Sequence, residues 1–83
     1  MNYDEKLNMS LLFDFYGDIL TERQKEIASL SFDEDLSLRE ISEITGITPQ
    51  GVRDSLNKCK NILAKATYIN IFSLQTKAHL FIV

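Results

Sequence analysis

Apolar residues recur at spacings of three and four along most of the chain, which is the period of α-helices that bury one face. The clearest pattern covers residues 37–63 and is interrupted once, at Thr45 and Gly46. It predicts two amphipathic helices that meet at a tight turn and share one inward face. That face consists of Leu38, Ile41, Ile47, Val52, Leu56, Cys59 and Leu63.

Signals for helix ends support this prediction. Ser37 with Glu40 three residues later forms a capping box, so the first helix should begin at the residue after Ser37. Gly46 should end it, because glycine adopts the positive φ of a tight turn without a steric penalty. Thr48 then caps the second helix, and Pro49 fills its first position, where a missing N–H costs nothing. The whole stretch is typical of a helix-turn-helix motif.

An opening helix is predicted over residues 4–20, and it is apolar nearly all round. One stripe consists of Leu7, Leu11, Leu12, Phe15, Tyr16 and Ile19, and a second of Met9, Phe13 and Leu20. A helix of this kind is buried from more than one side. Either it runs through the core, or its extra face meets another subunit, which would make the protein a homodimer through this helix and the C-terminal segment.

The next helix is predicted over residues 22–32, after a capping box of Thr21 and Gln24. Its inward residues should be Ile27, Ala28, Leu30 and Phe32. The following run of Asp33, Glu34 and Asp35 breaks helicity. Three consecutive acids lack the alternating ligand spacing of a calcium loop, so we expect a solvated turn and no metal site.

Beyond residue 66 the pattern loses definition. Residues 67–72 fit a helix and a strand about equally, because they are rich in β-branched and aromatic types. Residues 77–83 are apolar and uncapped, so they pack on the domain, join a subunit contact or are exposed. The expected organisation is an all-α small helical bundle: a helix-turn-helix domain over residues 1–66, with its motif at 37–63, and an atypical apolar tail over 67–83.

Length and composition indicate one small globular domain, with 83 residues, 45% of them hydrophobic and 25% charged. The net charge of −3 is unevenly distributed. Residues 1–44 hold eleven acids and four bases, whereas residues 45–83 hold five bases and one acid. The second helix of the motif therefore lies in the positive half, as a surface that meets phosphate would.

The sequence offers no convincing candidate residues for catalysis or for binding a small molecule, a cofactor or a metal. Cys59 lies on an apolar helix face, where a thiol behaves as a small hydrophobe, and His79 has no partner nearby in the sequence. The three glycines are too dispersed for a phosphate-binding loop. We therefore expect no enzyme activity, no small-molecule substrate, no cofactor and no metal. Without a basic signal region or a run of about 18 apolar residues, a cytoplasmic protein that does not enter membranes is expected.

The outward face of the second motif helix is polar and consists of Gln50, Arg53, Asp54, Asn57, Lys58 and Asn61. All of these except Asp54 carry hydrogen-bond donors, and Gln and Arg are the types that read adenine and guanine bidentately. This face is predicted to bind double-stranded DNA. The alternative is the solvated side of an ordinary helical hairpin.

Three stretches give the chain a family resemblance: LLFDFYGDILTERQ at 11–24, DEDLSLREIS at 33–42 and ITPQGVRD at 47–54. The chain resembles the YlxM family, small bacterial helix-turn-helix proteins encoded beside genes of the signal recognition particle, which in turn look like region 4 of sigma factors. The resemblance implies an all-α fold, DNA binding and a regulatory link to that pathway. The positions that match the family's recognition helix are Thr48, Gln50, Gly51, Val52 and Asp54.

Pro49 and Arg53 depart from the residues that are common in the family, and the apolar tail replaces a long charged helix thought to support dimerisation. The tail has therefore diverged, or the chain is truncated or frame-shifted. On the DNA-binding hypothesis, Thr48 and the helix N-terminus hold a phosphate, and Gln50 with Arg53 reaches base edges. The DNA backbone is held by Asn57 and Lys58, with Lys60 as a further candidate. A competing hypothesis is a protein-interaction module with a sigma region 4-like fold that does not bind DNA.

Overall fold

The computed structural model describes residues 3–82, with side chains over residues 4–70. The described residues form four α-helices and one short 3-10 helix, with no strand among them. In chain order these are α1 (Tyr3–Tyr16), η1 (Gly17–Ile19), α2 (Glu22–Phe32), α3 (Leu38–Thr45) and α4 (Pro49–Ile82). The protein is therefore all-α, as the sequence predicts.

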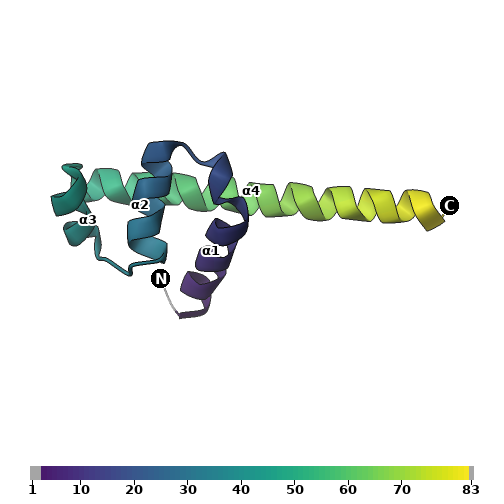
Figure 1. Cartoon of the computed structure of the whole chain (residues 1–83), viewed down its shortest axis with the longest axis horizontal. Helices are drawn as coiled ribbons and strands as arrows, with labels where there is room; N and C mark the ends of the chain where they lie inside the picture. Colours follow the sequence, from purple (N-terminus) through teal and green to yellow (C-terminus); the bar gives the residue numbers. More distant parts are fainter. Residues whose placement is uncertain (1–2, 83) are drawn as a thin grey trace.

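The first three helices pack against the N-terminal part of α4, which runs the length of the molecule (Figure 1). Beyond α1 the axis of α4 continues away from the bundle, so the molecule is elongated, with extents of 55 × 25 × 17 Å. The long helix is thus the support on which the other three are assembled.

The predicted helix starts of α2 and α3 are confirmed in atomic detail. Each N-cap hydroxyl accepts a hydrogen bond from the backbone N–H three residues later, over 3.2 Å at Thr21 and 3.1 Å at Ser37. In return, Gln24 Oε1 accepts from the N–H of Thr21, and Glu40 Oε1 accepts from that of Ser37. Both capping boxes are complete, so the sequence alone fixes where these helices begin.

The core lies between α4 and the other helices and contains the residues predicted for the motif. The side chains of Ile41, Val52, Cys59 and Leu63 have no exposed surface, and Leu56 is 6% exposed. The remaining buried apolar residues are Leu20, Ile27, Ala28 and Phe32. Leu30, Leu38 and Ile47 are partly buried against them. The inward faces predicted for α2, α3 and the first half of α4 are therefore confirmed.

The stripes predicted for the opening helix hold only in part, because Met9, Phe13 and Leu20 face the core whereas the first stripe is divided between core and surface. The residues of α1 that pack on the core are Met9, Leu12, Phe13 and Tyr16, and the ring of Phe13 meets that of Phe32 edge-on at 6.1 Å. The apolar side chains on the opposite side of α1 and in η1 are exposed: Leu7, Leu11, Phe15 and Ile19. The helix therefore does not run through the core, because a domain of this size supplies neighbours for only one of its faces.

The predicted helix over residues 4–20 also ends earlier than expected. The α-helix stops at Tyr16, and a 3-10 turn follows over Gly17–Ile19. Gly17 is buried, and a Cβ there would lie 3.0 Å from two ring carbons of Phe13. The Phe13 ring lies so close to the backbone here that glycine fits better than a larger residue. The chain turns toward α2 after this point.

Of the two structures that residues 67–72 allow, the backbone adopts the helix, since α4 is continuous to Ile82. A single long helix satisfies the backbone hydrogen bonds of this stretch without a neighbouring strand. The predictions on how residues 77–83 pack, and on His79, concern side chains outside the described residues.

Candidate nucleic-acid interface

The turn between α3 and α4 is held by glycine geometry and by hydroxyl hydrogen bonds. Gly46 has φ +76°, the left-handed conformation predicted for it. The hydroxyl of Ser42 donates to the carbonyl of Ile47 over 2.5 Å, and the hydroxyl of Thr45 accepts from the N–H of Ile47 over 3.3 Å. These contacts favour one direction in which α4 leaves the turn.

Arg23 of α2 braces the same turn from outside. Its Nη2 donates to the carbonyl of Thr45 over 3.0 Å, and its Nη1 pairs with Glu26 at 3.0 Å. The carbonyls at the end of a helix lack partners within that helix, so this guanidinium satisfies one of them. Sequence analysis missed this role of Arg23, because the two ends of the contact lie 22 residues apart.

The candidate residues lie on the exposed side of α4, opposite its buried stripe. The side chains of Thr48, Gln50, Arg53, Asn57 and Lys58 are exposed, and Gly51 is half-buried. The predicted polar face thus exists as a surface.

Two of these residues already have partners within α4. The hydroxyl of Thr48 accepts from the N–H of Gly51 over 3.1 Å, which confirms its role as N-cap. Gln50 Nε2 donates to Asp54 Oδ1 over 3.0 Å. This bond uses one of the two amide N–H groups of Gln50, and it holds Asp54, the anion on this face, beside it.

Gly51 has a packing role that the motif match does not reveal. A Cβ at this position would lie 2.7 Å from Cγ2 of Ile47 and 3.2 Å from the hydroxyl oxygen of Thr48. Contacts this short require the turn to shift. The close fit of α4 against its own turn is enough to explain glycine here.

The candidate side chains do not form one compact cluster. At about 100° per residue, Lys58 projects about 140° from Arg53 around the helix axis, whereas Lys60 projects within about 20° of it. Asn57 projects about 40° from Arg53, on the side toward Lys58 but nearer to Arg53. One flank therefore joins Arg53, Asn57 and Lys60, and the opposite flank carries Lys58.

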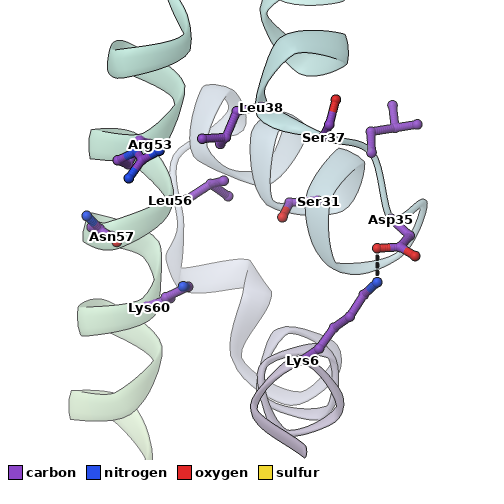
Figure 2. A pocket seen from close by; sticks show the side chains of 10 residues that line it. Lys6, Ser31, Asp35, Ser37, Leu38, Arg53, Leu56, Asn57 and Lys60 are labelled. Carbon is purple, nitrogen blue, oxygen red and sulfur yellow. Dashed lines mark ion pairs between the residues drawn. The ribbon is translucent and has the colours of Figure 1, made fainter. Parts of the chain in front are cut away.

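The flank with Arg53 borders a pocket of about 470 Å³. Figure 2 shows Arg53, Asn57 and Lys60 extending from α4 on one side of it, and Lys6 reaching up from α1 on the other. The remaining lining residues are Ser31, Asp35, Leu36, Ser37, Leu38 and Leu56. Lys6 is a functional candidate that sequence analysis missed, because only the fold brings α1 beside the N-terminal part of α4.

Ion pairs connect this pocket to the rest of the domain. Lys6 pairs with Asp35, a residue with φ 60° in the turn before α3 (Figure 2). Lys60 Nζ lies 3.8 Å from Glu5 Oε1, so α1 is tied electrostatically to both α4 and the α2–α3 turn. Asp35 is one of the three consecutive acids for which the sequence predicts a solvated turn without a metal site. Its carboxylate pairs with Lys6.

Cys59 is buried beneath this face, and its thiol lies 3.7 Å from the carbonyl oxygen of Gln24, to which it donates. Burial raises the pKa of the Cys59 thiol, which disfavours the nucleophilic thiolate. Over the described side chains, no group of three His, Cys, Asp or Glu residues is placed to hold a metal ion. No helix in the described part of the chain is both long and apolar enough to cross a membrane.

Comparison with known proteins extends the resemblance to nearly the whole chain. The family UPF0122, described as "Putative helix-turn-helix protein, YlxM / p13 like", matches residues 3–80. The match therefore continues past residue 63, through most of the C-terminal part of α4. No solved structure matches the chain.

Relatives from several bacteria cover the same region. A UPF0122 protein of Caldanaerobacter subterraneus is 48% identical over 60 residues, which are 72% of this chain and 51% of the relative. One from Clostridium novyi is 40% identical over 60 residues, 72% of this chain and 52% of the relative. One from Clostridium botulinum is 30% identical over 80 residues, 95% of this chain and 73% of the relative.

This chain spans about half the length of most of these curated relatives. The matched range nevertheless includes α1, α2, α3, the turn with its left-handed glycine, and α4 as far as residue 80. The chain belongs to the UPF0122 family, the YlxM/p13-like helix-turn-helix family.

Proposed function

We propose that this protein binds double-stranded DNA through the N-terminal part of α4 and acts in the cytoplasm by binding, without catalysis. The observation that carries the proposal is the exposed polar side of α4, set opposite a fully buried stripe and directed by a rigid turn. A recognition helix needs this combination, because side chains can read base edges only from a helix whose orientation is fixed.

Arg53 is the residue expected to read a base. It is exposed, and it has no hydrogen bond or ion pair with the described residues, so it loses no internal partner on binding. A bidentate contact with guanine is worth about 1–3 kcal/mol of discrimination. Asn57 continues the same flank, while Lys58 reaches the backbone on the other side of the groove.

The test is a gel-shift titration with DNA fragments selected for binding, at about 50 and 200 mM salt. Arg53→Ala should weaken binding by about 1–3 kcal/mol and relax specificity at one base pair. Lys58→Ala should weaken all sequences alike and lower the salt slope by about one. Lys65→Ala is the matched control, because it removes an exposed lysine of α4 that lies outside the motif and outside the predicted contact set.

If neither Arg53→Ala nor Lys58→Ala alters retention on DNA while the wild-type protein binds, the proposed face is wrong. Gly51→Ala should not be used to map contacts. Its effect on binding would follow from the displaced turn and not from a lost contact with DNA.

A second candidate function is favoured by the exposed apolar residues of α1. Leu7, Leu11 and Phe15 are 47%, 50% and 82% exposed, and Tyr68 and Ile69 of α4 are 72% and 62% exposed. A protein-interaction module that uses such surfaces, including a homodimer through α1 and the C-terminal part of α4, would bury them. It predicts no gel shift even at low salt, whereas the DNA-binding proposal predicts a shift that salt removes.

The homodimer can be tested independently of DNA. Phe15→Glu places a charge on the most exposed of these residues and should halve the mass measured by light scattering if α1 forms the subunit contact. Arg39→Gln changes the net charge by the same −1 at an exposed position of α3 and controls for a change of charge alone. A wild-type mass of one chain over the whole accessible concentration range would rule out the dimer.

The regulatory link to the signal recognition particle pathway belongs to this proposal only as an implication of the family resemblance. It predicts that fragments selected from genomic DNA include the region around genes of that pathway. Selection of unrelated fragments would separate DNA binding from this particular role.

A further inference from the structure

The pocket beside Arg53 gathers positive charge from two helices that are distant in sequence. Lys6 of α1 and Lys60 of α4 line it together with Arg53, so three cations surround one cavity (Figure 2). Only Asp35 among the lining residues is an anion, and Glu5 lies at the edge beside Lys60. The balance is positive in a protein whose net charge is −3, which indicates a site for an anion.

The three cations differ in how strongly each already interacts with an acidic side chain of the protein. Arg53 has no partner among the described residues. Lys60 is 3.8 Å from its carboxylate partner, beyond hydrogen-bonding distance, and its side chain is 28% exposed. Lys6 pairs directly with Asp35, whose own side chain is 73% exposed. An incoming anion can therefore replace Glu5 at Lys60 and Asp35 at Lys6, while Arg53 stays available for a base edge.

Uncharged groups complete the site. Ser31, Ser37 and Asn57 supply hydrogen-bonding groups on its wall, and Leu38 and Leu56 form an apolar surface between α3 and α4 (Figure 2). An oxyanion with several acceptor oxygens suits such a mixture of cations and neutral donors better than a single halide ion does. Phosphate has this chemistry.

We propose that this pocket binds a phosphate of the DNA backbone next to the groove that α4 enters, with Lys60 and Lys6 as contacts additional to the motif. The inference rests on the DNA-binding proposal. A polymer phosphate is favoured over a free one because the pocket shares Arg53 and Asn57 with the face that reads the groove. A duplex on that face brings its backbone to the pocket, and the site fixes the register of α4 on the DNA.

Glu5 and Asp35 then act as internal competitors of the phosphate. In the free protein they partly neutralise Lys60 and Lys6, and in the complex the phosphate takes over this role. Removing a lysine should weaken DNA binding, whereas removing its acidic partner should strengthen it. A purely structural role of these ion pairs predicts that both substitutions have the same effect, because either one breaks the pair.

The experiment measures duplex affinity by fluorescence anisotropy over a series of salt concentrations. Lys60→Ala and Lys6→Ala should each lower the slope of log affinity against log salt by about 0.9, with unchanged sequence preference. Glu5→Gln should raise affinity about two- to fivefold at low salt. Asp35→Asn should act in the same direction.

The matched controls come from an ion pair on another part of the surface. Lys25 is 32% exposed and pairs with Asp18 at 3.1 Å, and neither lines the pocket. Lys25→Ala and Asp18→Asn change the net charge by the same amounts as the test substitutions. They should leave the salt slope nearly unchanged.

The outcomes separate this inference from the proposal on which it rests. Absence of any duplex binding by the wild-type protein overturns the proposed function. Duplex binding that is sensitive to Arg53→Ala but unaffected by Lys60→Ala overturns the phosphate pocket alone. Equal losses of duplex affinity with Lys60→Ala and Glu5→Gln also overturn it, in favour of a structural ion pair.

Saturation of the pocket by a mononucleotide at micromolar concentration, seen as amide shifts at Ser37 and Lys60, would assign the pocket to a free nucleotide instead.

Discussion

The N-terminal half of α4 and the helix α1 pack against each other, yet they use their apolar residues differently. In α4 the stripe from Val52 to Leu63 is at most 6% exposed. In α1 three of the apolar side chains, Leu7, Leu11 and Phe15, are between 47% and 82% exposed. Similar hydrophobic spacing in the sequence therefore has two structural meanings, a core in one helix and a surface in the other.

The difference follows from the number of neighbours. The first half of α4 contacts α1, α2 and α3, so its whole apolar stripe is enclosed. By contrast, α1 packs on α2 and α4 with one face, and no further helix among residues 3–82 covers the other. Apolar residues on that uncovered face contribute little to the stability of the single chain.

The largest expected effect is on the free energy of unfolding, and it compares a buried leucine of α4 with an exposed leucine of α1. Leu63→Ala should lower the free energy of unfolding by about 2–5 kcal/mol, because Leu63 is fully buried and its loss leaves a cavity. Leu11→Ala removes the same atoms from a side chain that is 50% exposed and should cost less than about 1 kcal/mol. Urea unfolding followed by circular dichroism measures both, and equal losses would contradict the contrast.

A smaller effect is expected at the turn that directs α4. Gly46→Ala should cost about 1–2 kcal/mol, because a Cβ is unfavourable at φ +76° even though nothing lies within 4 Å of it. Asn tolerates this conformation better, so Gly46→Asn should cost clearly less. Thermal unfolding of the two variants makes the comparison. A larger loss with Asn would show that space, and not backbone conformation, limits this position.

Loss of a helix cap should be smaller again. Ser37→Ala removes the hydroxyl that accepts from the N–H of Glu40 and should cost about 1 kcal/mol. Ser37→Asp keeps an acceptor at the N-cap and should restore most of the stability. Equilibrium unfolding of the three proteins tests this. No recovery with Asp would mean that Ser37 stabilises the fold by another route than capping.

The smallest effect concerns pH and the buried thiol of Cys59. Burial raises its pKa in the folded state, so the folded protein holds the thiol proton more tightly than the unfolded chain does. The corresponding stability is present below the unfolded thiol pKa of about 8.5 and is lost as pH rises above it. The stability difference between wild type and Cys59→Ala should therefore narrow between about pH 7 and 10 in urea titrations. A difference independent of pH would contradict this.

Much of the fold follows from local sequence. The capping boxes at Thr21 and Ser37 fix two helix starts, and Gly46 fixes the turn, because each involves only residues within three or four positions. The inward residues of α3 and α4 also follow from spacing. Both helices are strongly one-sided, and one-sided helices have only one face to bury.

Tertiary structure decided what local signals leave open. Helix α1 has apolar residues on both sides, so only its place at the edge of the bundle determines that Phe13 is inside and Phe15 outside. The predicted DNA-binding residues show the same limit, because spacing puts Arg53 and Lys58 on one polar face but does not reveal the pocket beside Arg53.

That pocket exists because α1 and the α2–α3 turn pack against the flank of α4. Sequence determined the start of α4 and its polar side through short-range hydrogen bonds and helical periodicity. Only the tertiary structure joined Lys6 to Arg53 and Lys60, since contacts between residues so far apart in the chain depend on how the helices pack.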